Sequence, residues 1–180
     1  MSDGRPQVQI ASALIRDGES LVMVYQGAPG EDRFWSIPSG RVEDGELVTE
    51  ALAREVQEET GLEVTDPGRI AFVLQIDNRR AEPLRHGRGP ALGYVATVWT
   101  FDVAGWHGAL APEDPDGVVF DARFVAVEES LVHLDRLEWQ SVTASYLRGE
   151  VAPGTVVLER WLTDRGRETI HTIAPWSSRS

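Results

Sequence analysis

The sequence predicts an α/β (α+β) fold in which a mixed β-sheet is sandwiched between α-helices. Runs rich in β-branched and aromatic residues come both before and after two separated helical segments. Turns that contain glycine, proline or aspartate separate these runs. A chain of 180 residues is long enough to bury a sizeable core as one domain.

The elements are expected in a definite order along the chain. Residues 7–16 and 20–26 are β-rich runs joined by the turn at 17–19, so they predict a hairpin, and a short strand follows at 33–38. A helix over 47–60 should end at Gly61, because glycine is the preferred residue just after a helix. The later segments are expected as strands at 69–76, 91–103 and 118–127, helices at 128–134 and 137–147, and a strand pair at 155–162 and 168–174.

The domain organisation follows from these elements. Residues 1–150 are expected to form one domain, and residues 151–180 a C-terminal β-hairpin extension of the same domain. This hairpin carries more apolar residues than a free two-stranded hairpin can expose, so it must pack on the domain or on a second subunit. Because exposed edge strands pair readily and two-fold dimers are the commonest assemblies, we expect a homodimer.

Composition excludes several classes of protein. The net charge of −12 argues against general binding to nucleic acid, which needs a basic face. No apolar run is long enough for a membrane span and no signal peptide is visible, so the expected location is cytoplasmic. With no cysteine, disulfides, thiolate metal sites and cysteine nucleophiles are excluded. All 17 basic residues are arginine, so a basic side chain that contacts phosphate must be a guanidinium.

The helix at 47–60 carries three glutamates on the side that should be buried. At roughly 100° per residue, one half of the helix surface is apolar, and it is formed by Leu47, Val48, Ala51, Leu52 and Val56. Glu55, Glu58 and Glu59 fall inside this apolar half. Two such charges about 5 Å apart repel by about 3 kcal/mol at an effective dielectric constant near 20. A glutamate-rich surface helix is the alternative, but the angular placement favours a divalent metal site.

Residues 40–62 then show a family resemblance. Their spacing of Gly40, Glu46, Arg54-Glu55-Val56, Glu58-Glu59 and Gly61-Leu62 resembles the Nudix box. The preceding FWSIPSG is similar to the strand that leads into the box, with Ser39 in place of a glycine found in many members. Residues 114–131 look like the family's later acidic loop, strand and helix start. The resemblance implies the Nudix fold.

The resemblance also implies an activity and its cofactor. Nudix hydrolases use Mg²⁺ or Mn²⁺ to cleave the diphosphate bridge of a nucleoside diphosphate linked to another moiety, here of the NTP, ADP-ribose or nucleotide-sugar type. The substrate would be a nucleotide-type small molecule. Markers of single substrate classes are mostly missing downstream of the box, so the identity of the substrate stays open. The alternative is a Nudix-fold nucleotide-binding or regulatory protein without turnover.

The resemblance assigns roles within the box. Glu55, Glu58 and Glu59 are expected to bind the metal together with the carbonyl of Gly40. Glu46 and Arg54 are expected to support them, with the guanidinium paired to Glu46 and orienting a ligand carboxylate. The alternative for Arg54 is a solvent-exposed pair with Glu50 or Glu58.

The general base and the substrate contacts stay open at this stage. The base is expected to be Glu58 or Glu55, with Glu58 favoured. The acidic loop with Glu113, Asp114 and Asp116 is the other candidate, although its aspartates are typical of turns. Substrate contacts are expected from a set of arginines, one aromatic ring and one acid, each of which has a plain structural alternative: Arg79, Arg80, Arg85, Trp35 and Glu113.

Overall fold

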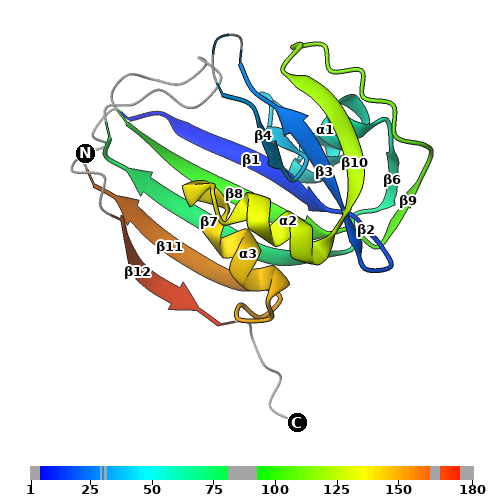
Figure 1. Ribbon diagram of the computed structural model, residues 1–180. Coiled ribbons are helices and arrows are strands. Elements are labelled where there is room, and N and C mark those ends of the chain that lie inside the picture. The colour runs from blue at the N-terminus through cyan, green and yellow to red at the C-terminus, as the bar shows by residue number, and fades with distance from the viewer. Residues whose placement is uncertain (1–4, 29, 31, 81–92, 163–166, 175–180) are drawn as a thin grey trace.

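The computed structural model describes residues 5–28, 30, 32–80, 93–162 and 167–174. A six-stranded mixed sheet runs in the order β12-β11-β7-β8-β1-β5 (Figure 1). A second sheet has the order β10-β3-β2, with β4 paired to β3, and β6 pairs with β9. The strands are β1 Gln7–Leu14, β2 Arg16–Asp17, β3 Ser20–Gln26, β4 Phe34–Ser36, β5 Ser39–Arg41, β6 Glu63–Asp66, β7 Arg69–Asn78, β8 Tyr94–Asp102, β9 Gly105–His107, β10 Val119–Ala126, β11 Thr155–Trp161 and β12 Arg167–Ile173.

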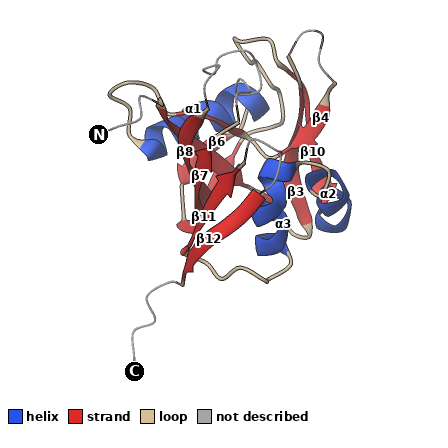
Figure 2. Cartoon of the chain, turned by 90° about the vertical axis from the view of Figure 1, so that its left-hand side faces the viewer, coloured by secondary structure: helices blue, strands red, loops and turns tan. Residues whose placement is uncertain are grey.

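The helices cover both faces of the larger sheet, as the sequence predicted. They are α1 Val48–Thr60, α2 Val127–Leu134 and α3 Ser141–Leu147, with the short 3-10 helix η1 Glu138–Gln140 before α3. In Figure 2, α2 and α3 lie on the same side of the strands β7 and β11. None of the helices in the described part of the chain is long and apolar enough to cross a membrane.

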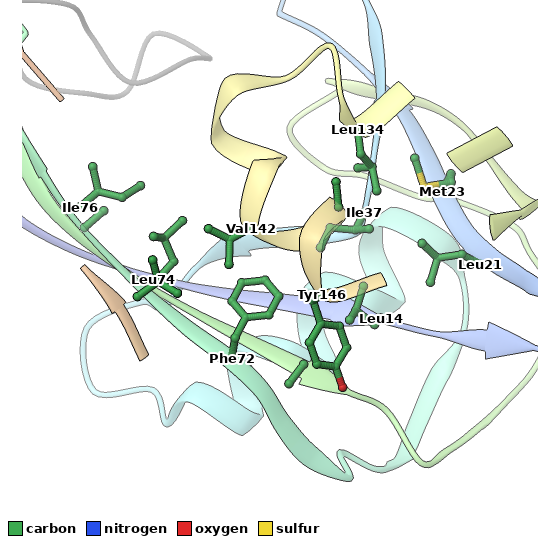
Figure 3. Close-up of a cluster of buried hydrophobic side chains, with 14 of the residues drawn as sticks. Leu14, Leu21, Met23, Ile37, Phe72, Leu74, Ile76, Leu134, Val142 and Tyr146 are labelled. Carbon is green, nitrogen blue, oxygen red and sulfur yellow. The ribbon is translucent and has the colours of Figure 1, made fainter. Parts of the chain in front are cut away.

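Strand β1 explains how two separate cores form. Successive side chains of a strand point to opposite faces, so Ala11 and Ala13 join Leu52 and Val56 of α1 in one buried cluster. Leu14 points the other way and joins the cluster that includes Phe72. In Figure 3 the side chains of α3 point toward β7 in this second cluster. The larger sheet is therefore held between α1 on one face and α2 with α3 on the other.

The prediction that residues 7–16 and 20–26 form a hairpin is wrong. Strand β1 pairs in parallel with β8 and antiparallel with β5 rather than with β3. The hairpin that does form is short and joins β2 to β3. The chain leaves the larger sheet at Ile15, whose carbonyl accepts a hydrogen bond from the N–H of Val22 at 2.9 Å. Strand pairing over long sequence separations is decided by the whole sheet, which a local turn signal does not show.

Helix α1 matches its predicted range closely. It begins after Leu47, whose N–H donates a hydrogen bond to the Glu50 carboxylate at 2.8 Å. It ends at Gly61, which has φ of 80° and donates its N–H to the carbonyl of Gln57 at 2.8 Å. A Cβ at Gly61 would also lie 2.6 Å from the carbonyl oxygen of Ala111. Only glycine suits this position.

The C-terminal hairpin forms as predicted and belongs to the larger sheet. Strand β11 pairs antiparallel with β12 and parallel with β7. Val157 and Trp161 are 5% and 6% exposed and are members of the core cluster around Phe72. Of the two alternatives, packing on the domain itself is therefore the one observed.

Asp77 is a charged link between three parts of the chain. Its carboxylate accepts hydrogen bonds from Arg5, Arg79 and Arg160. Burial by itself raises the pKa of Asp77, but these three hydrogen bonds outweigh it and hold the pKa well below its ordinary value. The ionised carboxylate therefore joins β7 and β11 to the N-terminal segment.

Replacing Asp77 should show the pH dependence of this link. Because the folded-state pKa lies below the unfolded one, the stabilisation is complete above about pH 4 and is lost as the pH falls further toward the folded-state pKa. We expect Asp77→Asn to lower the free energy of unfolding by about 1–3 kcal/mol at pH 7 and by less at pH 3. Urea denaturation at the two pH values measures both effects, with Asp17→Asn at the exposed end of β2 as control. If Asp77→Asn lowered the free energy of unfolding by the same amount at both pH values, the charged link would be contradicted.

Candidate active site

A cavity of about 1020 Å³ opens between the two sheets. One half of its lining comes from β5, α1 and the loop before β10, and this acidic half comprises Gly40, Glu55, Glu58, Glu59 and Asp114. The other half, called the inner half below, comprises Gln26, Phe34, Asn78, Tyr94, Trp139, Gln140 and Trp161. The predicted metal-binding residues thus lie together in one half of one cavity.

The three glutamates of α1 differ in their surroundings. Glu59 is 5% exposed and accepts a hydrogen bond from the N–H of Ser39 at 2.8 Å. Glu55 lies against Gly40, where a Cβ atom would come within 1.9 Å of the Glu55 carboxyl carbon. The Glu58 side chain is 31% exposed. A side chain at position 40 would therefore displace the Glu55 carboxyl group, so glycine allows Glu55 to occupy this place.

Arg54 connects the supporting residues to the triad. Its guanidinium bonds both carboxylate oxygens of Glu46, at 2.9 and 3.0 Å, and the carbonyl of Arg41 at 2.8 Å. The same guanidinium donates to Glu55 at 2.8 Å and to Glu58 at 3.2 Å. Each of these contacts fixes one carboxylate relative to the loop that precedes the helix. Arg54 is half-buried among them rather than paired with Glu50 in solvent.

The acidic half holds more negative charge than its neighbours neutralise. Burial raises the pKa of Glu59 well above its ordinary value, and the hydrogen bond from Ser39 offsets this only in part. Burial also raises the pKa of Glu55, while Arg54 lowers it. Asp114 adds a further repulsive charge to both glutamates. A cation at this position would relieve the repulsion.

The residues present fit a hard divalent cation. Three carboxylates and a backbone carbonyl supply only oxygen ligands, which Mg²⁺ and Mn²⁺ prefer. The absence of a Cβ at Gly40 lets the backbone approach Glu55 closely. Within the described ranges, however, no three acidic or histidine side chains already converge as a metal cluster. Since Mg²⁺ keeps several waters beside one or two carboxylates, a site without a preformed all-protein cage still suits it.

The acidic loop is held mainly by its own backbone. The Asp114 carboxylate accepts hydrogen bonds from the N–H groups of Asp116, Val118 and Val119 at 3.1, 2.7 and 2.9 Å. The Glu113 side chain is exposed and does not line the cavity, although its N–H donates to the Glu58 carbonyl at 2.9 Å. These contacts favour the turn interpretation of Asp114 over a role as general base.

Comparison with known proteins identifies the family. The family model described as the NUDIX domain matches residues 6–146. This span includes every residue of the acidic half of the cavity. The chain belongs to the Nudix family. The fold expected from the Nudix box is therefore confirmed, and the hairpin β11–β12 lies after the matched span.

The individual relatives of this Nudix domain are distant. The NAD-capped RNA hydrolase NudC of Mycobacterium bovis is 26% identical over 157 residues, which are 82% of this chain and 42% of that protein. An octanoyltransferase of Myxococcus xanthus is 35% identical over 85 residues, which are 47% of this chain and 22% of that protein. The chain thus spans less than half the length of these curated relatives. The crystal structure of the mutator MutT protein of Bacillus halodurans has the same fold, with a TM-score of 0.64, 17% identity, and coverage of 92% of this chain and 96% of that one.

Two of the expected substrate contacts are engaged in other interactions. Arg80 is 7% exposed, and its guanidinium makes two hydrogen bonds to Glu138, at 2.9 and 2.8 Å. Trp35 is absent from the cavity lining and instead packs against Tyr25, with ring centroids 5.1 Å apart. Since neighbouring residues of a strand face opposite ways, the ring of β4 that lines the cavity is that of Phe34.

The other expected arginines lie at or beyond the edge of the described structure. Arg79 is exposed and pairs with Asp77 at 3.0 Å, and it does not line the cavity. Arg85 falls outside the described residues. The expected arginine-rich receiving loop is therefore represented here by Arg79 and Arg80 alone.

Sequence reasoning missed the residues of the inner half. Asn78 belongs to the inward face of β7 with Phe72, Leu74 and Ile76, so an amide interrupts an otherwise apolar alternation. That interruption was visible in the sequence and could have marked the site. Trp139 and Trp161 carried no such signal, because large aromatic side chains usually belong to the core.

Proposed function

We propose that this chain is a Mg²⁺- or Mn²⁺-dependent pyrophosphohydrolase that cleaves the diphosphate bridge of a nucleoside diphosphate linked to another moiety. The observation that carries the proposal is the gathering of three α1 glutamates against Gly40 in one half of a 1020 Å³ cavity. The negative charge of the acidic half suits a divalent metal ion, which in turn would bind the diphosphate. The relative NudC is an NAD-capped RNA hydrolase, which is compatible with this substrate class.

The proposed roles follow from the contacts around α1. Glu55, Glu58, Glu59 and the Gly40 carbonyl would hold the metal. When bound, the metal would neutralise phosphate charge and lower the pKa of a coordinated water. Arg54 holds Glu55 and Glu58 in place through its hydrogen bonds.

Glu58 is the general base in this proposal, with Glu55 as the alternative. The Glu58 side chain is the more exposed of the two, at 31% against 16%, so water reaches it more readily. It takes a proton from the attacking water as the water oxygen bonds to phosphorus. The bridging P–O bond breaks and the second phosphate leaves with the bridging oxygen. Positioning and charge stabilisation dominate such a reaction.

The test is a panel of nucleotide derivatives incubated with and without Mg²⁺ or Mn²⁺. Release of a nucleoside monophosphate or of pyrophosphate only in the presence of metal would support the proposal. The alternative, a Nudix-fold binding or regulatory protein, would bind members of the panel without releasing products. In an active enzyme, Arg79 and Arg85 are proposed as cations that receive the phosphate or the terminal sugar.

We also propose a homodimer that uses the edge of the larger sheet. Strand β12 is the edge strand, and its side chains Ile170 and Ile173 are 44% and 49% exposed. An unpaired edge strand that carries two exposed isoleucines is a surface on which a second copy can add its own edge strand. Light scattering should give the mass of a dimer for the intact chain and of a monomer for Ile170→Arg. A monomeric mass for the intact chain would refute the dimer.

A further inference from the structure

Two buried carboxamides line the inner half with polar atoms that have no hydrogen-bond partner among the described residues. Gln26, at the end of β3, is 6% exposed, and no hydrogen bond within the described chain engages its side chain. Asn78, at the end of β7, is 3% exposed. Its Oδ1 accepts the N–H of Arg80 at 2.9 Å, but its NH₂ group has no partner among the described residues. Buried polar groups in native proteins are almost always satisfied, so a ligand that fills the cavity can supply the partners that these amides lack.

A third carboxamide is held in a set orientation. The hydroxyl of Thr143 donates to Oε1 of Gln140 at 2.6 Å, and Nε2 of Gln140 donates to Oγ of Ser36 at 3.1 Å. A carboxamide has two donor hydrogens and two acceptor lone pairs. Gln140 thus keeps one donor and one acceptor for another group in the cavity that it lines.

Aromatic rings lie beside each of these amides. Gln26 faces Phe34 across the β3–β4 ladder. Asn78 is aligned with Tyr94 on one side and with Trp161 on the other. Trp139 precedes Gln140 and meets Phe34 edge-on, with ring centroids 5.6 Å apart. Rings with neutral amides between them suit a flat heteroaromatic group with polar edges.

The same half is poorly suited to a phosphate. Among the described residues, the arginine that lines the cavity beside this half is Arg80, whose guanidinium lies 5.1 Å from the ring centroid of Trp161. Glu138 bonds that guanidinium through both of its oxygens. Phosphate recognition in this chain requires arginine, because lysine is absent. The charged end of a nucleotide therefore belongs in the acidic half with its metal, and the base belongs in the inner half.

The hydrogen-bonding character of the amides narrows the base. The NH₂ group of Asn78 offers two free donors, whereas Oδ1 already accepts the N–H of Arg80 and keeps only one lone pair. A ring carbonyl accepts from such a donor, whereas an exocyclic amino group would bring N–H against N–H. We propose that the inner half binds the nucleobase of the substrate and selects an oxo base, such as uracil or hypoxanthine, over the corresponding amino base through Asn78. This proposal rests on the proposed function, since it assumes that the ligand of the cavity is a nucleotide.

Matched pairs of nucleoside monophosphates test the proposal by calorimetry. UMP and CMP differ in a carbonyl or amino group and in the adjacent ring nitrogen, which carries a hydrogen only in the oxo base, and IMP and AMP differ in the same way. The ratio of their dissociation constants therefore separates recognition of this edge of the base from phosphate binding. We expect about tenfold tighter binding of UMP over CMP and of IMP over AMP, the size expected for one hydrogen bond made or opposed. Ribose 5-phosphate, which has no base, should bind more weakly than any of the four.

Variants of one strand provide the internal control. In Asn78→Asp the carboxylate still accepts the Arg80 N–H but no longer donates, so the preference should fall or reverse toward CMP and AMP. Gln75→Glu adds the same charge on the exposed face of β7 and should leave both ratios unchanged. Equal affinity within both pairs, ratios unaffected by Asn78→Asp, or no binding of any monophosphate would each overturn the proposal. Because binding is measured without turnover, a protein that shows the ratios but hydrolyses nothing would refute the proposed function and leave the base site standing.

Discussion

Glu58→Gln and Glu59→Gln should each lower kcat by roughly 100-fold or more, the scale found for positioned acid–base groups. Glutamine keeps the size of the side chain but removes the charge that the proposed metal and the attacking water require. Glu59→Gln should still accept the Ser39 N–H through its amide oxygen, so the loop before α1 is expected to stay in place. The measurement is steady-state kinetics on whichever nucleotide derivative the substrate panel identifies.

The fold should survive both changes. Burial already disfavours the charged form of Glu59, so a neutral amide at this position should leave the metal-free protein at least as stable. Thermal unfolding in the presence of chelator checks this. Glu129→Gln, on the exposed side of α2, is the matched control and should change neither kcat nor stability. Full turnover by either box variant would remove these residues from the site.

Trp161→Ala should lower the free energy of unfolding by about 3–5 kcal/mol, the usual cost of truncating a buried tryptophan. The side chain is 6% exposed, lies in the core cluster around Phe72, and donates its indole N–H to Glu159 at 2.9 Å. The Arg80 guanidinium lies 5.1 Å from its ring centroid. Truncation therefore enlarges the cavity that Trp161 lines and also leaves the buried Glu159 without this donor.

Trp161→Ala is compared with Thr172→Ala, a change in the other strand of the same hairpin, by denaturation in guanidinium chloride. Thr172 is exposed on β12, so its truncation should change stability by no more than about 0.5 kcal/mol. Equal and small effects at the two positions would mean that the hairpin contributes little to the fold. A large effect at Trp161 alone would show that residues beyond the matched Nudix span complete the core.

The site on α1 could be predicted from the sequence because a helix repeats on a short, regular period. Winding residues 47–60 at roughly 100° per residue places Glu55, Glu58 and Glu59 on the buried side, and the structure buries Glu59 and half-buries the other two. The spacing of the Nudix box identified the family for the same reason, since all of its positions lie within one helix and the loops beside it. Local geometry was sufficient for both.

The inner half of the cavity could not be predicted, because it is assembled from strands far apart in the chain. Asn78, Tyr94 and Trp161 become neighbours only when β7 pairs with β8 and with β11. Whether Trp35 or Phe34 reaches the cavity depends on the register of β4 against β3, and a shift of one residue would exchange them. Strand pairing and register follow from how all the apolar faces are buried at once, so the tertiary structure alone decided these contacts.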